Sequence, residues 1–190
     1  MLLNSQILFS GVLVAKSRPA VYGRIAQSFH WLSAALILIM APMGLIMVRM
    51  ADSTLRNSLY RVHVTIGMLV VVLTLARLVW AFLESQPDSP AGIQGRHLWL
   101  YKGVQYLFYI ILFALGSTGA GMLLISGIGL FPGNVTPQAI TQGILPQSGH
   151  MLMSRIFMAL LAAHLFGIFQ YQFTKEDVLN RMGLKLGMGK

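Results

Sequence analysis

The chain has 190 residues, of which 56% are hydrophobic and only 10% are charged. A soluble domain carries about 25% charged residues, so this composition is typical of a helical membrane protein and argues against a soluble globular domain. The absence of cysteine excludes disulfides, iron–sulfur clusters, thiolate zinc sites and covalently attached c-type haem. The formal charge of +9 does not indicate a nucleic-acid partner, because the basic residues flank apolar runs instead of forming one face.

Residues 1–22 precede the first long apolar run, and we interpret them as an extension to a transmembrane domain that covers 23–190. Met1 to Ala15 are fairly apolar but have neither a basic start nor an A-x-A-like exit, so they do not resemble a cleaved signal peptide. Because this stretch is too short to cross a bilayer, we expect it to be interfacial or disordered.

Four transmembrane helices are predicted in the rest of the chain. They cover about residues 25–48, 62–83, 98–125 and 150–173, and each is close to the roughly 20 residues that cross the hydrocarbon core. The first connection is short and polar, the second is rich in proline and glycine, and the third carries no charge. The predicted fold is an all-α integral membrane four-helix bundle.

Lys and Arg are unevenly distributed between the two ends of these spans. If the N-terminus lies inside, ten of the 14 basic residues fall on the cytoplasmic half, and the other four are Arg49, Arg56, Arg61 and Arg155. This bias predicts that both termini face the cytoplasm.

Four of the five histidines lie in or at the ends of the predicted spans: His30, His63, His150 and His164. Ionisable residues at membrane depth are rare and usually functional. His150 and His164 are separated by about 21 Å of helical rise and by nearly four whole turns, so both point to the same face of the fourth helix. One helix therefore offers a histidine near each membrane surface.

The chain topology predicts how the histidines pair. His30 lies near the start of the first helix, which enters from the cytoplasm, so it shares the depth of His164. His63 opens the second helix, which enters from outside, so it shares the depth of His150. A His30–His63 pair would have to bridge the membrane. The topology permits only the pairs His30/His164 and His63/His150.

Two bis-histidine pairs suit two six-coordinate b-type haems, which favour electron transfer because neither axial position is open. Zinc or copper is the rival interpretation, but a structural zinc needs four ligands at one point, and these four are split between opposite surfaces. A haem-free bundle that transports or anchors is a further alternative. We interpret His97, at the edge of the second loop, as a solvated histidine and leave it out of the ligand set.

Five basic residues are candidate partners of haem propionates, because arginine binds carboxylates bidentately and stays charged when partly buried. Those near the outer pair are Arg61 and Arg155, and those near the inner pair are Arg24, Arg77 and Lys102. The alternative for each is a snorkelling side chain that marks the membrane interface.

Glycines recur beside the predicted ligands. Gly67 lies one turn after His63, and the third helix carries Gly116, Gly119 and Gly121. Each is interpreted as allowing close approach either of a haem edge or of a neighbouring helix.

These residues together resemble the bacterial cytochrome b561 family, a group of di-haem, quinone-linked membrane cytochromes. The resemblance covers about residues 24–184 and rests on four motifs in order: His30-Trp31-Leu32; Arg61-Val62-His63 with Gly67 and Arg77-Leu78; the pair His150 and His164; and Lys175-Glu176-Asp177-Val178-Leu179-Asn180-Arg181-Met182. The chain departs from the family at Lys102 and Gln105, where members often carry histidines, and at Tyr171-Gln172-Phe173, where many have "HHF".

The resemblance implies two haems b held by the same four histidines, ubiquinone as substrate, and a place in a bacterial inner membrane. It leaves two functions open. One is a superoxide:ubiquinone oxidoreductase, in which Arg56, Arg61 and Arg155 attract the anion. The other is an electron-relay or anchor subunit for a dehydrogenase or hydrogenase partner. No catalytic residue is assigned.

Overall fold

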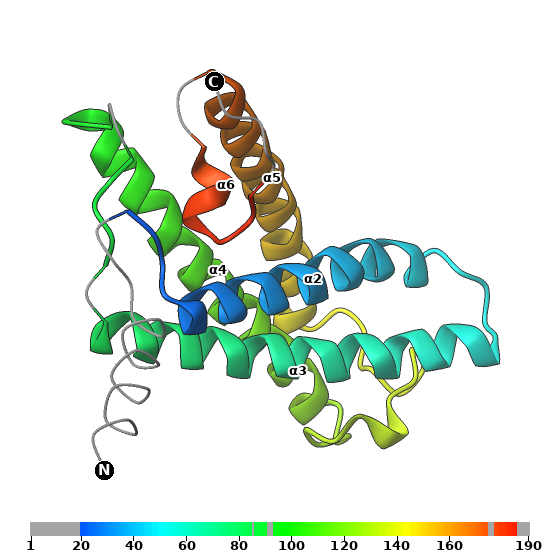
Figure 1. Cartoon of the computed structure of the whole chain (residues 1–190). Helices are drawn as coiled ribbons and strands as arrows, with labels where there is room; N and C mark the ends of the chain where they lie inside the picture. Colours follow the sequence, from blue (N-terminus) through cyan, green and yellow to red (C-terminus); the bar gives the residue numbers. More distant parts are fainter. Residues whose placement is uncertain (1–19, 85, 91–92, 175–176, 186–190) are drawn as a thin grey trace, which may run out of the picture. The chain divides into compact units, whose positions relative to one another are not determined.

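A computed structural model describes residues 20–84, 86–90, 93–174 and 177–185 of the chain. Its regular elements are α2 (Arg24–Met47), α3 (Thr54–Leu83), α4 (Arg96–Ile125), the short 3-10 turn η1 (Pro132–Asn134), α5 (Leu145–Thr174) and α6 (Val178–Arg181) (Figure 1). The described residues contain helices and no strand, which confirms the predicted all-α class. The extension predicted at 1–22 lies outside the described residues, except for residues 20–22.

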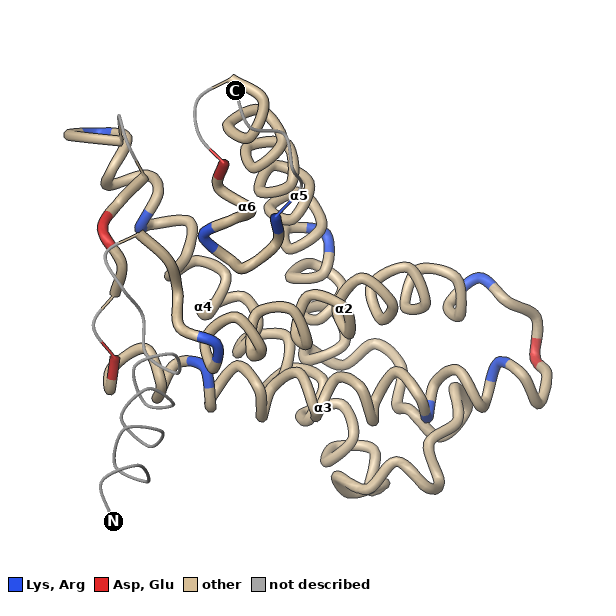
Figure 2. The backbone as a smooth tube through the Cα atoms, in the orientation of Figure 1, with Lys and Arg blue, Asp and Glu red and all other residues tan. Residues whose placement is uncertain are grey.

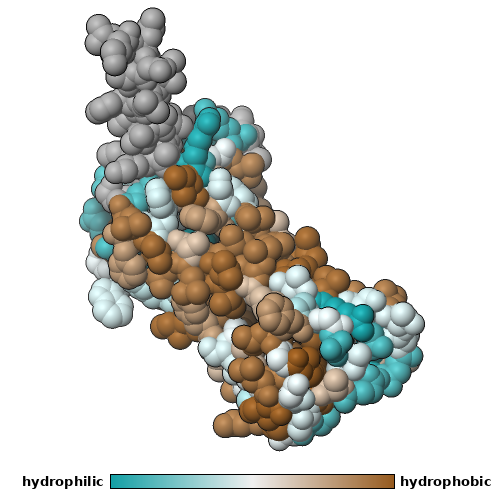
Figure 3. Space-filling model, turned by 90° about the horizontal axis from the view of Figure 1, so that it is seen from below, coloured by the Kyte–Doolittle hydropathy of each residue, from teal (hydrophilic) through white to brown (hydrophobic). Residues whose placement is uncertain are grey.

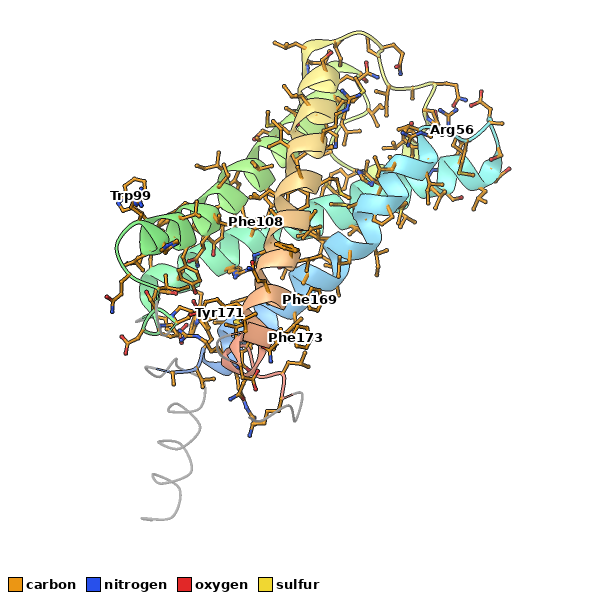
Figure 4. The ribbon with its side chains drawn as sticks, turned by 90° about the horizontal axis from the view of Figure 1, so that it is seen from above. Arg56, Trp99, Phe108, Phe169, Tyr171 and Phe173 are labelled. Atoms are coloured by element: carbon orange, nitrogen blue, oxygen red, sulfur yellow. The ribbon has the colours of Figure 1, made fainter. Side chains whose placement is uncertain are left out.

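The four long helices are each long and apolar enough to cross a membrane. Lys, Arg, Asp and Glu lie mostly toward helix ends and in the connections (Figure 2). Large apolar side chains are exposed along all four helices. Figure 3 shows apolar patches on the face that it draws. Trp99 on α4 is 83% exposed and points away from the ribbon (Figure 4). Soluble monomers rarely expose so much contiguous apolar surface, so lipid is its expected solvent.

Two helices begin earlier than the sequence predicts. α3 begins at Thr54 rather than at about 62, because the Ser53 hydroxyl accepts a hydrogen bond from the Arg56 amide at 3.1 Å and caps the helix. α5 begins at Leu145 rather than at about 150, and its first turn contains Pro146, whose missing N–H is not needed there. His63 and His150 therefore lie inside their helices and not at the first residue.

The chain divides into two compact units, and each takes parts of all four long helices. The second unit comprises Ser33–Thr74 and Gln105–Leu161. Its core contains Ile37, Val70, Ile111 and Phe157. Within it, the adjoining parts of α2 and α3 lie side by side, joined by a short loop (Figure 1). This unit holds His63 and His150.

The first unit contains the described residues up to Leu32, together with Leu75–Val104 and the chain from Ala162 onward. Its C-terminal segment folds back on the start of α2, where the Trp31 indole donates to the Met182 carbonyl at 2.8 Å. The Tyr22 amide donates to the Arg181 carbonyl at 3.0 Å, and the buried Arg181 guanidinium donates to the Asp88 carbonyl. This unit holds His30 and His164.

Candidate haem sites

His63 on α3 and His150 on α5 lie close together within the second unit, with one ring edge-on to the other. Their ring centroids are 6.4 Å apart, and the ring planes are inclined by 76°. A metal atom bound to both rings, with metal–nitrogen bonds of about 2 Å, would hold the two centroids roughly 6 Å apart. The observed separation of the centroids therefore matches the spacing of two imidazoles that share one metal atom.

Two groups of α4 fix the orientation of the His150 ring. Its Nδ1 atom lies 3.1 Å from the Leu115 carbonyl oxygen and 3.2 Å from the Thr118 hydroxyl. A carbonyl only accepts, so Nδ1 carries the proton in this hydrogen bond and Nε2 keeps its lone pair. A hydrogen bond from the non-ligating ring nitrogen is the usual support of a metal-binding histidine.

The His63 ring is positioned by close packing. A Cβ atom added at Gly44 on α2 would lie 3.0 Å from its Cε1 atom, so any larger residue would press on the ring and displace it slightly. The Met40 carbonyl lies near the ring, but it does not complete a hydrogen bond to Nδ1, which has no partner among the described residues. A buried ring nitrogen without a partner is unusual in a packed protein, so the His63 ring is held by packing and not by a hydrogen bond from the described part of the chain.

His30 and His164 come together within the first unit. His30 on α2 lies close enough to His164 on α5 to interact with it electrostatically, and both are within the same range of Arg77 on α3. Nδ1 of His30 is buried and has no hydrogen-bond partner among the described residues. The unit thus places two half-buried imidazoles within electrostatic range of one guanidinium.

The five basic residues predicted to meet propionates occupy different surroundings. Arg77 is half-buried beside His30 and His164, as described above. Arg61 donates through Nε to the Val135 carbonyl at 3.3 Å, so part of its guanidinium holds the third loop. Arg24, Lys102 and Arg155 are exposed. The geometry therefore favours Arg77 most directly as a propionate partner.

Two other predicted groups can be placed. Arg56 pairs with Asp52 and donates to the Met47 carbonyl at 3.1 Å at the start of α3 (Figure 4), so it closes the first loop. His97 is exposed on α4. Across the described ranges, no three His, Asp or Glu side chains gather as ligands of a metal ion. The two separate histidine pairs are therefore the candidate ligands that the described residues contain.

A polar cluster lies in the same unit as His30 and His164. Burial raises the pKa of the Tyr22 hydroxyl, and its hydrogen-bonded contact with Tyr101 raises it further, against the opposing charges of Arg181 and Arg77. Tyr22 therefore stays protonated and able to donate over the physiological range.

Gln172 explains one departure from the family pattern. Its amide donates to the Asp177 carboxylate at 2.9 Å and accepts from the Leu179 amide at 3.0 Å. The residue that stands in the place of a histidine thus ties α6 to the end of α5.

Gly44, Thr118 and the Leu115 carbonyl are the site groups that sequence reasoning missed. Gly44 stands among apolar residues after Pro42, and Thr118 lies in a run of small residues, so neither has a signal of its own. Gly119 was singled out, and a Cβ there would lie 3.6 Å from Cε1 of His150. Spacing from a histidine on the same helix cannot find groups that face it from another helix.

The chain is similar to known proteins over most of its length. The family model described as "Prokaryotic cytochrome b561" matches residues 21–184. The chain is 27% identical to "Cytochrome b561 homolog 2" of Escherichia coli (strain K12) over 173 residues, covering 86% of this chain and 92% of that protein. It is also 30% identical to "Cytochrome b562" of Cereibacter sphaeroides over 105 residues, covering 53% of this chain and 66% of that protein. The chain therefore belongs to the prokaryotic cytochrome b561 family, and it is a multi-pass membrane cytochrome that carries haem b and transfers electrons.

Proposed function

We propose that this protein is a quinone-linked oxidoreductase with two haems b, one between His63 and His150 and one between His30 and His164. The 6.4 Å separation of the His63 and His150 ring centroids carries the proposal, because it leaves room for one iron atom between two imidazoles. A haem held by two histidines in this way would supply one-electron transfer.

The chain's own residues supply the setting for this chemistry. The Leu115 carbonyl holds His150 with Nε2 free to bind, and Gly44 leaves space for the His63 ring. Arg77 places a positive charge beside His30 and His164, where it can balance anionic propionates. We propose further that His63 and His150 lie toward the outside, and that His30 and His164 lie toward the cytoplasm.

Ubiquinone is the proposed electron acceptor, and superoxide is the proposed donor. Oxidation of two superoxide anions to O₂ supplies the two electrons that, with two protons, convert ubiquinone to ubiquinol. The exposed Arg155 side chain and the part of Arg61 that does not contact Val135 are cations suited to attract an anion. Arg56 contributes less than the sequence suggested, because Asp52 neutralises it.

Stopped-flow spectroscopy of the purified holoprotein tests this function. Superoxide is expected to reduce the haem, and a soluble ubiquinone analogue is expected to reoxidise it. Arg155→Ala should slow reduction several-fold at low salt and by less at high salt, because screening already weakens the attraction. Arg96→Ala removes another exposed cation, on the proposed cytoplasmic half, and should leave the rate unchanged.

The alternative function predicts a different result. An electron-relay subunit would be reduced by dithionite but not by superoxide, and it would co-purify with a dehydrogenase or hydrogenase. That outcome would exclude superoxide:ubiquinone oxidoreductase activity, but it would not contradict the proposed haem sites.

A further inference from the structure

The two histidines of the second unit are held in different ways. The ring of His150 has a hydrogen-bonded Nδ1 atom, with the Leu115 carbonyl at 3.1 Å and the Thr118 hydroxyl at 3.2 Å. Nδ1 of His63 has no such partner among the described residues, and its ring packs close to Gly44. The ring of His150 is therefore hydrogen-bonded to polar groups of α4, and the ring of His63 has no such hydrogen bond within the described ranges.

The direction of each hydrogen bond around Thr118 follows from its partners. The Thr118 hydroxyl donates to the Ala114 carbonyl at 2.7 Å, and the Leu115 carbonyl lies 3.1 Å from it. A hydroxyl has one proton and two lone pairs, so with its proton directed at a carbonyl it faces His150 as an acceptor. The Nδ1 proton of His150 is thus shared between the Leu115 carbonyl and the Thr118 oxygen.

We propose that Thr118 is a positioning residue that sets the reduction potential of the haem bound by His63 and His150; this rests on the proposed function. When Thr118 accepts a hydrogen bond from Nδ1 of His150, Nε2 of the same ring becomes more basic. A more basic ligand stabilises ferric over ferrous iron, so Thr118 lowers the midpoint potential of this haem. His30, whose buried Nδ1 lacks a partner among the described residues, receives no equivalent support.

Redox titration of the holoprotein, followed optically, tests the inference with three variants. Thr118→Val keeps the shape of the side chain and removes the oxygen. It is expected to raise one of the two midpoints by up to about 59 mV, which corresponds to a tenfold change in the ferrous-to-ferric ratio. The affected haem should be the one that is lost in His63→Ala. Thr118→Ser keeps the oxygen and is expected to match the wild type.

Thr74→Val is the matched control. Thr74 is buried on α3 in the same unit, and its hydroxyl also donates to a carbonyl four residues earlier, that of Val70, at 2.7 Å. The substitution therefore removes the same kind of bond without touching a histidine. It should leave both midpoints unchanged.

Each result decides one of the two claims. Unchanged midpoints in Thr118→Val, with both haems retained, would overturn the role of Thr118 and leave the haem sites standing. Equal shifts in Thr118→Val and Thr118→Ser would also overturn it, because the hydroxyl would then not be the cause. If Thr118→Val loses one haem on purification, restoration of that haem in Thr118→Ser supports the inference, and persistent loss contradicts it. Wild-type protein with no haem at His63 and His150 would instead refute the proposed function.

Discussion

Gly44 shows how narrowly single residues define the histidine sites. Replacing it with Ala places a methyl group 3.0 Å from Cε1 of His63, so the ring has to move away from its place opposite His150. We expect Gly44→Ala to weaken binding of that haem about 10- to 100-fold, the usual cost of disturbing the support of a metal ligand. Haem content and the reduced spectrum of the purified protein measure the effect.

Gly103→Ala serves as the control for this substitution. Gly103 also lies inside a helix, and a Cβ there meets nothing within 4 Å. Alanine favours helix over glycine by about 1 kcal/mol, so neither substitution weakens its helix intrinsically. Equal haem content in Gly44→Ala and Gly103→Ala would show that contact with Gly44 does not position His63.

The histidines and their neighbours differ in how far the sequence predicts them. The depth of a histidine in the membrane and the helix face on which it lies can both be read from its position along the chain. These two properties predict His63 and His150 as a pair, and the two rings lie 6.4 Å apart in the structure. Gly44 and Thr118 act on a histidine of another helix. Their role depends on how each helix is rotated about its axis and on which neighbouring helix it contacts. The sequence of a single helix does not predict either property.

At the scale of elements, α6 depends on one side chain at the end of α5. Gln172→Ala removes the acceptor of the Leu179 amide and the donor to Asp177, each worth about 1 kcal/mol. We expect hydrogen exchange of the Leu179 and Asn180 amides to increase about tenfold while the haem spectrum stays unchanged. Mass spectrometry of exchanged peptides from this segment gives the comparison.

Gln170→Ala is the matched control, because Gln170 lies on the same helix with an exposed side chain. It should leave the exchange of the α6 amides at the wild-type rate. Wild-type exchange in Gln172→Ala as well would mean that Asp177 and the backbone hold α6 without Gln172.

The four long helices could be expected from hydropathy, but two of their beginnings could not. The first turns of α3, from Thr54 to Arg61, are polar and lie outside the apolar span, so hydropathy assigns them to a loop. Ser53 extends the helix by capping it, an effect of one hydrogen bond. The helix α6 is only four residues long, and two side chains from other helices hold its ends. Trp31 on α2 donates to the Met182 carbonyl, and Gln172 on α5 accepts from the Leu179 amide. Hydropathy does not predict either contact.

At the scale of the whole molecule, the proposed orientation places both termini in the cytoplasm. The chain has no cysteine, so a single introduced thiol reports its own position. Ala51→Cys and Gln138→Cys should react with a membrane-impermeant thiol reagent in intact spheroplasts, and Gln94→Cys and Lys185→Cys should react only after permeabilisation. All four positions are exposed. The reverse pattern would invert the orientation and place the His63/His150 pair on the cytoplasmic side.

The central claim is that two haems are held by two specific histidine pairs. Haem content and reduced-minus-oxidised spectra of His30→Ala, His63→Ala, His150→Ala and His164→Ala, compared with the wild type, test it most directly. The account predicts two haems in the wild type, loss of one and the same haem in His63→Ala and His150→Ala, and loss of the other in His30→Ala and His164→Ala. Loss of different haems in His63→Ala and His150→Ala, or two intact haems in either variant, would contradict it.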